Sequence, residues 1–338
     1  MFSRFERRVD RRVDKFMSEK PSASKAKTGF DKAVNVPEWH GLFTAEVEVS
    51  KGVNQETKDS EKVASIVLEA LGVTPELVYK TLSKDMPEDQ SFELCIVKKK
   101  KENQYDIIAS LIGSDGKYSL TSTARIERGC RGGHFVNINT GFSQSSKPGK
   151  GLGRMLAFNN MQLLKLIGKS KVRLTAGRQN GAYVWSRFGF LPTDEEQTKQ
   201  VLGQARARLR SLCQFVSADR AKKLLSFMDG LDVTNPQSLW QLADWGININ
   251  SLFGNKKEAA LDSIMDQYGE EFKTHFMRSE NITLGKLLMT QLYKFEAEFD
   301  FDNPDQVRRA ETYCGQTFDT VARRMTSAHI LTGQEQPS

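Results

Sequence analysis

The sequence predicts an α+β fold in which a region of strands and helices precedes a region of helices alone. Three observations support this prediction. Residues 135–142 alternate between two sets of side chains, as in a strand. A glycine-containing loop and a segment with helical apolar spacing, residues 155–167, follow. From Thr193 onward, helical spacing replaces the alternation, so the chain changes character there.

The central stretch continues in the same order after the loop and its helix. Lys171–Ala176 alternates as a second short strand, and Asn180–Phe188 has the spacing of a short helix that Gly189 ends. The predicted order is therefore strand, glycine loop, helix, strand, helix.

Upstream of this stretch, the chain predicts two helices between strands. Ser60 is placed to cap a helix that stops at Gly72, and Thr74 precedes a second helix with Pro75 at its first position. The predicted strands are Leu42–Ser50, Phe92–Val97, Tyr105–Ile112 and Tyr118–Glu127, and the predicted turns are Lys98–Lys101 and Ser114–Lys117.

Downstream, the spacing of apolar residues predicts helices only. Acidic residues at Asp194, Glu195 and Glu196 favour a helix start, because the amino end of a helix attracts negative charge. The predicted helices run from Thr193 to about Phe215, from Ser217 to Gly230, around Leu239–Trp245, and over Lys256–Met277, Thr283–Phe299 and Pro304–Ile330, the last capped by Asp302 or Asn303.

The first 38 residues predict a basic amphipathic arm with a linker. Apolar residues such as Val9 and Val13 fall on one helical stripe of residues 1–20, and arginines occupy most of the rest. Neither a secretory signal nor a transit peptide fits, because an apolar core is missing and acids are present. The arm either docks on its own protein or binds a partner, a membrane surface or nucleic acid.

The composition is that of a chain with a real core and a basic excess. Of 338 residues 38% are hydrophobic, and the net charge is +7. The four cysteines lack C-x-x-C spacing, which signals neither a zinc site nor a disulfide framework and favours a reducing, cytoplasmic compartment. No apolar run approaches the ~20 residues of a membrane helix, and we expect no metal site.

The glycine loop suggests a phosphate site. Gly149, Gly151 and Gly153 lie where a strand gives way to a helix, and the free N–H groups of a first helical turn favour anions. Between Glu127 and Asp194 there is no acid, while eleven lysines and arginines occur. This run suggests a basin for a polyanion, although a solvated basic face would have the same composition.

Two common phosphate motifs do not fit the loop. A Walker motif would need glycine where Gln144 stands and Ser or Thr where Gly151 stands. The dinucleotide fingerprint would need a third glycine where Leu156 stands.

The stretch instead resembles the GNAT superfamily of acyl-CoA-dependent N-acyltransferases. The signature of that family falls on Pro148–Gly153, where Pro148 replaces the usual Gln or Arg, and its characteristic ending falls on Asn180–Phe190. The upstream order of strand, helix, helix extends the resemblance. It implies a mixed central sheet with flanking helices over residues 39–195, between the arm of residues 1–38 and a helical region of residues 196–338.

The resemblance also implies a cofactor and site residues. Acetyl-CoA would donate its acyl group to an amine of unknown identity, with a protein acceptor slightly favoured. The implied cofactor-binding residues are Phe142, Ser143, Lys147, Lys150, Gly151, Leu152, Gly153, Arg154, Asn180 and Trp185.

Catalysis needs a group that takes a proton from the amine and one that protonates the leaving thiolate. Glu127 and His134 are the candidate bases, as the nearest carboxylate and neutral base in the sequence. Trp185 stands where the family often has a tyrosine acid, so Tyr183, the nearest phenol, is the candidate proton donor.

Two other functions stay open. The chain could be a catalytically degenerate module of the same shape that serves assembly or interaction, in a phage particle or as a secreted effector. Nucleic-acid binding through the basic face is less favoured, because no aromatic residues are interleaved as in single-strand binders.

Overall fold

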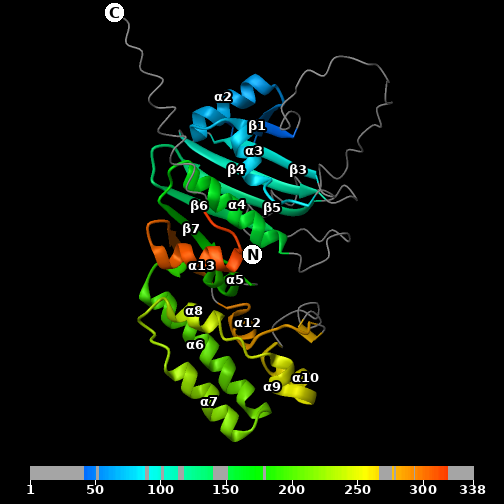
Figure 1. Ribbon diagram of the computed structural model, residues 1–338, viewed down its shortest axis with the longest axis vertical. Helices are drawn as coiled ribbons and strands as arrows, with labels where there is room; N and C mark the ends of the chain where they lie inside the picture. Colours follow the sequence, from blue (N-terminus) through cyan, green and yellow to red (C-terminus); the bar gives the residue numbers. More distant parts are fainter. Residues whose placement is uncertain are drawn as a thin grey trace, which may run out of the picture.

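The computed structural model describes residues 42–50, 53–87, 91–99, 103–112, 118–139, 151–177, 180–265, 276–277, 279–292 and 294–318. Within these residues, nine strands form one mixed sheet that helices flank (Figure 1). The predicted basic arm and its linker, and the predicted turn at residues 114–117, lie outside the described residues.

The strands follow one another across the sheet in the order β2-β1-β3-β4-β5-β6-β7-β9-β8. They are β1 (Phe43–Ser50), β2 (Val53–Thr57), β3 (Ser91–Lys98), β4 (Gln104–Ile112), β5 (Tyr118–Glu127), β6 (Gly132–Asn139), β7 (Lys171–Ala176), β8 (Leu191–Pro192) and β9 (Phe295–Asp300). The pairs β1·β3 and β6·β7 are parallel and the others antiparallel. The sheet is therefore mixed, as predicted.

The described helices divide between the sheet and a second layer below it in Figure 1. Those beside the sheet are α2 (Ser60–Leu71), α3 (Pro75–Leu82), α4 (Leu152–Leu166), α5 (Gly181–Phe188) and α13 (Pro304–Cys314). Those of the second layer are α6 (Glu195–Leu212), α7 (Ala218–Asp229), α8 (Ser238–Ala243), α9 (Ile249–Phe253), α10 (Lys257–Met265) and α12 (Leu284–Met289). Short 3-10 turns at Cys213–Phe215 and Gly254–Lys256 follow α6 and α9.

Local signals place most helix ends correctly. Gly72 ends α2 in the left-handed conformation at φ 70°, and Gly189 ends α5 in the same way at φ 97°. Thr74 and Ser217 cap α3 and α7 through their hydroxyl groups. The cap of α2 is Asp59 rather than Ser60, because its carboxylate accepts from the first-turn N–H groups of α2.

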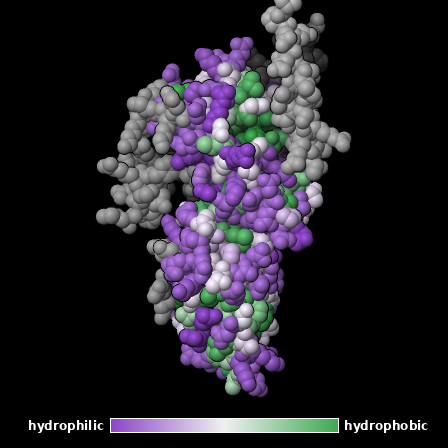
Figure 2. Space-filling model, turned by 90° about the vertical axis from the view of Figure 1, so that its left-hand side faces the viewer, coloured by the Kyte–Doolittle hydropathy of each residue, from purple (hydrophilic) through white to green (hydrophobic). Residues whose placement is uncertain are grey.

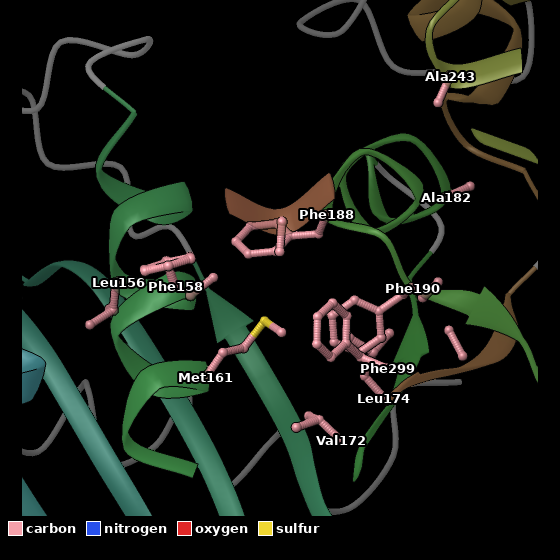
Figure 3. Close-up of a cluster of buried hydrophobic side chains, with 14 of the residues drawn as sticks. Leu156, Phe158, Met161, Val172, Leu174, Ala182, Phe188, Phe190, Ala243 and Phe299 are labelled. Carbon is pink, nitrogen blue, oxygen red and sulfur yellow. The ribbon is translucent and has the colours of Figure 1, made fainter. Parts of the chain in front are cut away.

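The core lies between one face of the sheet and the helices beside it. In Figure 3, Met161 from α4 and Phe188 from α5 point toward each other above Val172 and Leu174 of β7. The ring centroids of Phe190 and Phe299 lie 5.3 Å apart. All of these residues except Leu174, which is 4% exposed, are fully buried.

The C-terminal region is not all-helical, which corrects the prediction. Helix α12 ends at Met289, and residues 295–300 form strand β9 between β7 and β8. Its side chains alternate between buried Phe295, Ala297 and Phe299 and more exposed acids, so it buries one face as a strand does. The predicted helix over Thr283–Phe299 is therefore wrong beyond α12.

Helix α13 is shorter than predicted, and its Gln306 side chain links β9 to the end of α5. It starts at the Asn303 cap and ends at Gly315, where φ is 67°, instead of continuing toward Ile330. The buried Gln306 amide donates to the carbonyls of Gly189 at 2.8 Å and Glu298 at 3.0 Å. Its oxygen accepts from the Asp300 N–H. A side chain of α13 therefore holds β9, next to the edge of the sheet, to the residue that ends α5.

The other face of the sheet at β6, β7 and β9 is polar. Lys171, Arg173 and Thr175 of β7 are exposed, while the alternate side chains of that strand are buried. Hydrophilic side chains also cover most of the side shown in Figure 2, with hydrophobic ones in scattered patches. None of the described helices combines the length and apolar character that a membrane crossing requires.

Candidate functional site

The parallel strands β6 and β7 separate before either one ends. Their ladder runs from the pair Gly132–Lys171 to the pair Phe135–Leu174, while β6 continues to Asn139 and β7 to Ala176. Within the described residues, the ends of the two strands pair only with their outer neighbours, β5 and β9. The sheet is therefore open between the carboxyl ends of β6 and β7.

A β-bulge accounts for this opening. Thr123 of β5 pairs with Asn137, but the next residue, Ala124, pairs with Phe135, so Val136 is an extra residue in β6. A bulge bends its strand and raises the local twist. We infer that the bend at Val136 turns the end of β6 away from β7.

Helix α4 begins with an uncapped glycine. Gly151 has φ 76°, a left-handed conformation that glycine adopts without strain, and no side chain caps the helix. The N–H groups of Leu152, Gly153 and Arg154 have no partner inside the helix, since they belong to its first turn.

The amino end of α4 also differs from most others in charge. Among the described helices of eight or more residues, only α4 and α5 lack both an acid in the first turn and a side-chain cap or proline there. The positive end of the α4 dipole is therefore not neutralised by an acid of its own first turn, which suits an anion.

Arg154 lies directly over this turn. Its Nη2 atom would be 3.2 Å from a Cβ atom built at Gly151, and its Nη1 atom donates to the Tyr313 carbonyl at 3.0 Å. Its guanidinium carbon is 5.4 Å from the centre of the Tyr313 ring. The end of α13 thus holds a cation beside the glycine, and the Arg154 side chain remains exposed.

Tyr313 lies near two arginines and near the candidate proton donor Tyr183. The guanidinium carbon of Arg187 is 5.3 Å from the Tyr313 ring centre. Burial raises the pKa of Tyr313 and the nearby Tyr183 raises it further, while Arg154 and Arg187 oppose the rise. The Tyr313 phenol therefore stays protonated at neutral pH. Burial also raises the pKa of the neighbouring Cys314 thiol to about 12.

Two of the implied cofactor-binding residues make contacts within the protein. The Asn180 side-chain oxygen accepts from the Thr290 hydroxyl at 3.2 Å, which ties α5 to the end of α12. The Trp185 ring packs against Phe190 and Phe188, with centroid distances of 5.1 and 5.6 Å. Both side chains are therefore engaged inside the protein.

The candidate bases lie far from the glycine turn. A Cβ atom built at Gly133 would lie 3.0 Å from Leu164, near the carboxyl end of α4. Gly133 precedes His134 and pairs with Ile126 of β5, the neighbour of Glu127. Because α4 has 15 residues, its two ends are about 22 Å apart. Glu127 and His134 are at the far end, so the structure does not bring them together with Tyr183 or the turn.

Four implied residues, Phe142, Ser143, Lys147 and Lys150, lie outside the described residues. Of the others, Gly151, Leu152, Gly153 and Arg154 form the amino end of α4 as predicted. Sequence reasoning missed Tyr313, because 159 positions separate it from Arg154 and no local pattern links them.

Among the described residues, no group of three or more His, Cys, Asp or Glu side chains is arranged to hold a metal ion. Comparison of the chain with protein-family models, with curated proteins and with solved structures finds no match.

Proposed function

We propose that this chain binds acyl-CoA at the amino end of α4 and transfers the acyl group, in the simplest case acetyl, to an amine. One observation carries the proposal: α4 starts without a cap or an acid near the end of β6, where β6 and β7 are no longer paired. A Cβ atom at Gly153 would be 4.0 Å from Leu120, the neighbour of Thr121, which pairs with Asn139 at the end of β6. Such a start suits the diphosphate of coenzyme A, and the open strand edges suit an extended arm that carries amide groups.

The cofactor would use main-chain groups and one cation. The N–H groups of residues 152–154 and the Arg154 guanidinium would hold the diphosphate. The amides of the pantetheine arm would pair with the free edge of β6, as a peptide adds to the edge of a sheet. This arrangement is the one that the resemblance to the GNAT superfamily implies.

In the proposed transfer, the amine nitrogen bonds to the thioester carbon and the carbon–sulfur bond breaks. Tyr183 would protonate the departing thiolate, with Tyr313 beside it. The amine must first lose its proton, because a free lysine amine of pKa ~10.4 is almost fully charged at pH 7. Much of the rate gain can come from positioning the two reactants.

The acceptor is an amine of unknown identity, and the helical layer below the sheet slightly favours a protein over a metabolite. A carboxylate of the acceptor itself or water could take its proton, since Glu127 and His134 lie near the opposite end of α4.

The first test measures cofactor binding by thermal unfolding. Acetyl-CoA at ~100 times its dissociation constant should stabilise the fold by ~2.7 kcal/mol, a melting rise of several degrees. Gly153→Asp should abolish this rise, because its carboxylate would face the diphosphate. The substitution suits the fold, since an acid in a first turn is favourable and a Cβ atom there meets only Leu120 at 4.0 Å.

Gly203→Asp is the matched control. It makes the same change of charge in α6, at an exposed position where a Cβ atom meets nothing within 4 Å. It should keep the full response to acetyl-CoA. If millimolar acetyl-CoA does not change the melting temperature of the unsubstituted chain, the proposed function is excluded.

A second candidate is a non-enzymatic module of the same shape, used in assembly or interaction. The separation of Glu127 and His134 from Tyr183 favours it, because no candidate base lies at the turn among the described residues. Mass spectrometry of labelled acetyl groups measures acyl transfer. Cofactor binding without any transfer to amines or proteins would favour this candidate.

A further inference from the structure

A second concave site lies at the opposite end of β6 and β7, on the polar face of the sheet. The hollow has a volume of about 240 Å³ and is lined by Arg131, Gly132, His134, Ser170, Lys171 and Arg173. A Cβ atom built at Gly132 meets nothing within 4 Å, so the space beside this residue is open. Sites for drug-sized ligands measure ~300–1,000 Å³, so this hollow suits a small group.

Two of its cations are fixed in place by one carboxylate. Glu298 of β9 accepts from Lys171 Nζ and from Arg173 Nε, both at 2.7 Å. Burial raises the pKa of Glu298, but the two cations lower it by more, so the carboxylate is charged at neutral pH. Asp300 adds a longer contact of 3.5 Å to Lys171.

Arg131 supplies a cation without a described ionic partner. Its carbonyl accepts from the N–H of Ser170 at 2.9 Å, which fixes its backbone beside the start of β7. Its side chain is exposed, and none of the described acids forms an ion pair with it.

His134 lies beside cations that disfavour its charged form. Burial lowers the pKa of His134, Arg173 and Arg125 lower it further, and Glu296 and Glu127 oppose them less. Arg125 is itself paired with Asp106 at 2.7 Å, which offsets part of its charge. At neutral pH the imidazole is uncharged and keeps one N–H that can donate.

We infer that this hollow binds a phosphate-class dianion carried by a small ligand. Arg131, Lys171 and Arg173 would supply charge-assisted hydrogen bonds, and the Ser170 hydroxyl and the His134 N–H would add neutral ones. The site is separate from the turn before α4 and does not depend on the proposed acyltransferase function.

The first test follows the imidazole of His134 by NMR while pH is varied in sulfate, which stays doubly charged throughout. The chain has four histidines, and His134→Asn identifies the resonance. Sulfate in the hollow should raise the pKa of His134 above its value in sodium chloride of equal ionic strength. An equal pKa in the two salts would overturn the inference.

The second test compares two charge reversals by calorimetry with inorganic phosphate at constant ionic strength. Arg131→Glu should weaken binding by about tenfold or more, since it removes a charge-assisted bond. Arg128→Glu makes the same change in the same turn, but Arg128 acts on Glu69 and Tyr105 outside the hollow. It should change the affinity at most a few-fold. Equal losses in the two variants would overturn the inference.

A third measurement separates this site from the proposed cofactor site and from nucleic acid. Gly153→Asp should keep its affinity for phosphate even if it loses acetyl-CoA. Loss of phosphate binding in Gly153→Asp would assign the phosphate to the turn and overturn the inference. Binding of a DNA duplex at 150 mM salt is compared between the unsubstituted chain and Arg131→Glu. Equal duplex binding by the two, with phosphate affinity unchanged by the duplex, would support a small-ligand site.

Discussion

At the scale of single residues, the candidate site depends on contacts between distant parts of the chain. Arg154 is held over Gly151 by the carbonyl and the ring of Tyr313. The ring of Tyr313 also packs edge-on against Phe188 at 5.4 Å. One tyrosine of α13 therefore supports both the core and the cation of the proposed diphosphate site.

Removal of the Tyr313 ring should weaken acetyl-CoA binding, if the proposed function holds. Tyr313→Ala should lower affinity several-fold and cost about 2 kcal/mol of stability, because a half-buried aromatic ring is lost. Tyr313→Phe should keep both properties, since the ring face and the carbonyl remain. Tyr79→Ala, which removes a ring that packs on Phe92, is the control for stability loss without loss of affinity. Calorimetry below the melting temperature checks these outcomes.

The carboxylate of Glu298 should make stability depend on pH in the acidic range. Its pKa in the folded protein lies below its ordinary value of 4.5, because Lys171 and Arg173 outweigh the effect of burial. A lowered pKa gives stability that is present above 4.5 and is lost as pH falls through the folded value. Urea unfolding should therefore show Glu298→Gln to be less stable at pH 7 than the unsubstituted chain. The difference should shrink below pH 4, and a constant difference would contradict the assignment.

At the scale of elements, β9 shows how a short strand can be mistaken for part of a helix. Residues 295–300 alternate with a period of two, which indicates a strand, but they follow a segment with helical spacing. The six residues alone do not reveal a partner. The partners of β9 are β7 and β8, which pair with it through backbone hydrogen bonds. The Gln306 side chain of α13 also links Glu298 of β9 to Gly189.

Loss of the Gln306 amide should lower the stability of the protein. Gln306→Leu leaves two carbonyls and one N–H without their partner, at a cost on the order of 3 kcal/mol. Gln200→Leu removes an exposed glutamine of α6 and should change stability by less than about 0.5 kcal/mol. Denaturant unfolding of both variants measures the difference. Equal stabilities would show that Gln306 is not a structural link.

At the scale of the whole molecule, the sheet is shared by the two regions that the sequence divides near residue 195. Strand β9 lies between β7 and β8, and its Phe299 packs against Phe190. Arg309 of α13 forms a two-bond ion pair with Asp244 at 2.7 and 2.9 Å and donates to the Ser186 carbonyl. The helical layer is thereby fastened to α5 through α13.

Neither region should fold alone. A fragment of residues 42–194 exposes the edge of β7 and the Phe190 ring, so its thermal unfolding should lack a cooperative transition. The same fragment co-expressed with residues 195–318 should co-purify with it and recover that transition. A cooperative transition in the first fragment by itself would show that β9 adds to a sheet that is already stable.

The elements whose signals are local follow from the amino-acid sequence alone. The strand-forming segments of β3 to β5, the glycines that end α2 and α5, and the caps of α3 and α7 depend on neighbouring residues alone. The glycine turn before α4 belongs to the same class. Its residues predict where an anion can bind, because backbone conformation and free N–H groups follow from local geometry.

Which distant residues share a site depends on strand pairing and helix packing. The tertiary structure separated Glu127 and His134 from the turn, placed Tyr313 beside Arg154, and formed the hollow at Gly132 from two strands. It also added β9 to the sheet. Such contacts follow from how strands pair and how helices pack, and residues more than a hundred positions apart carry no periodic signal of their proximity.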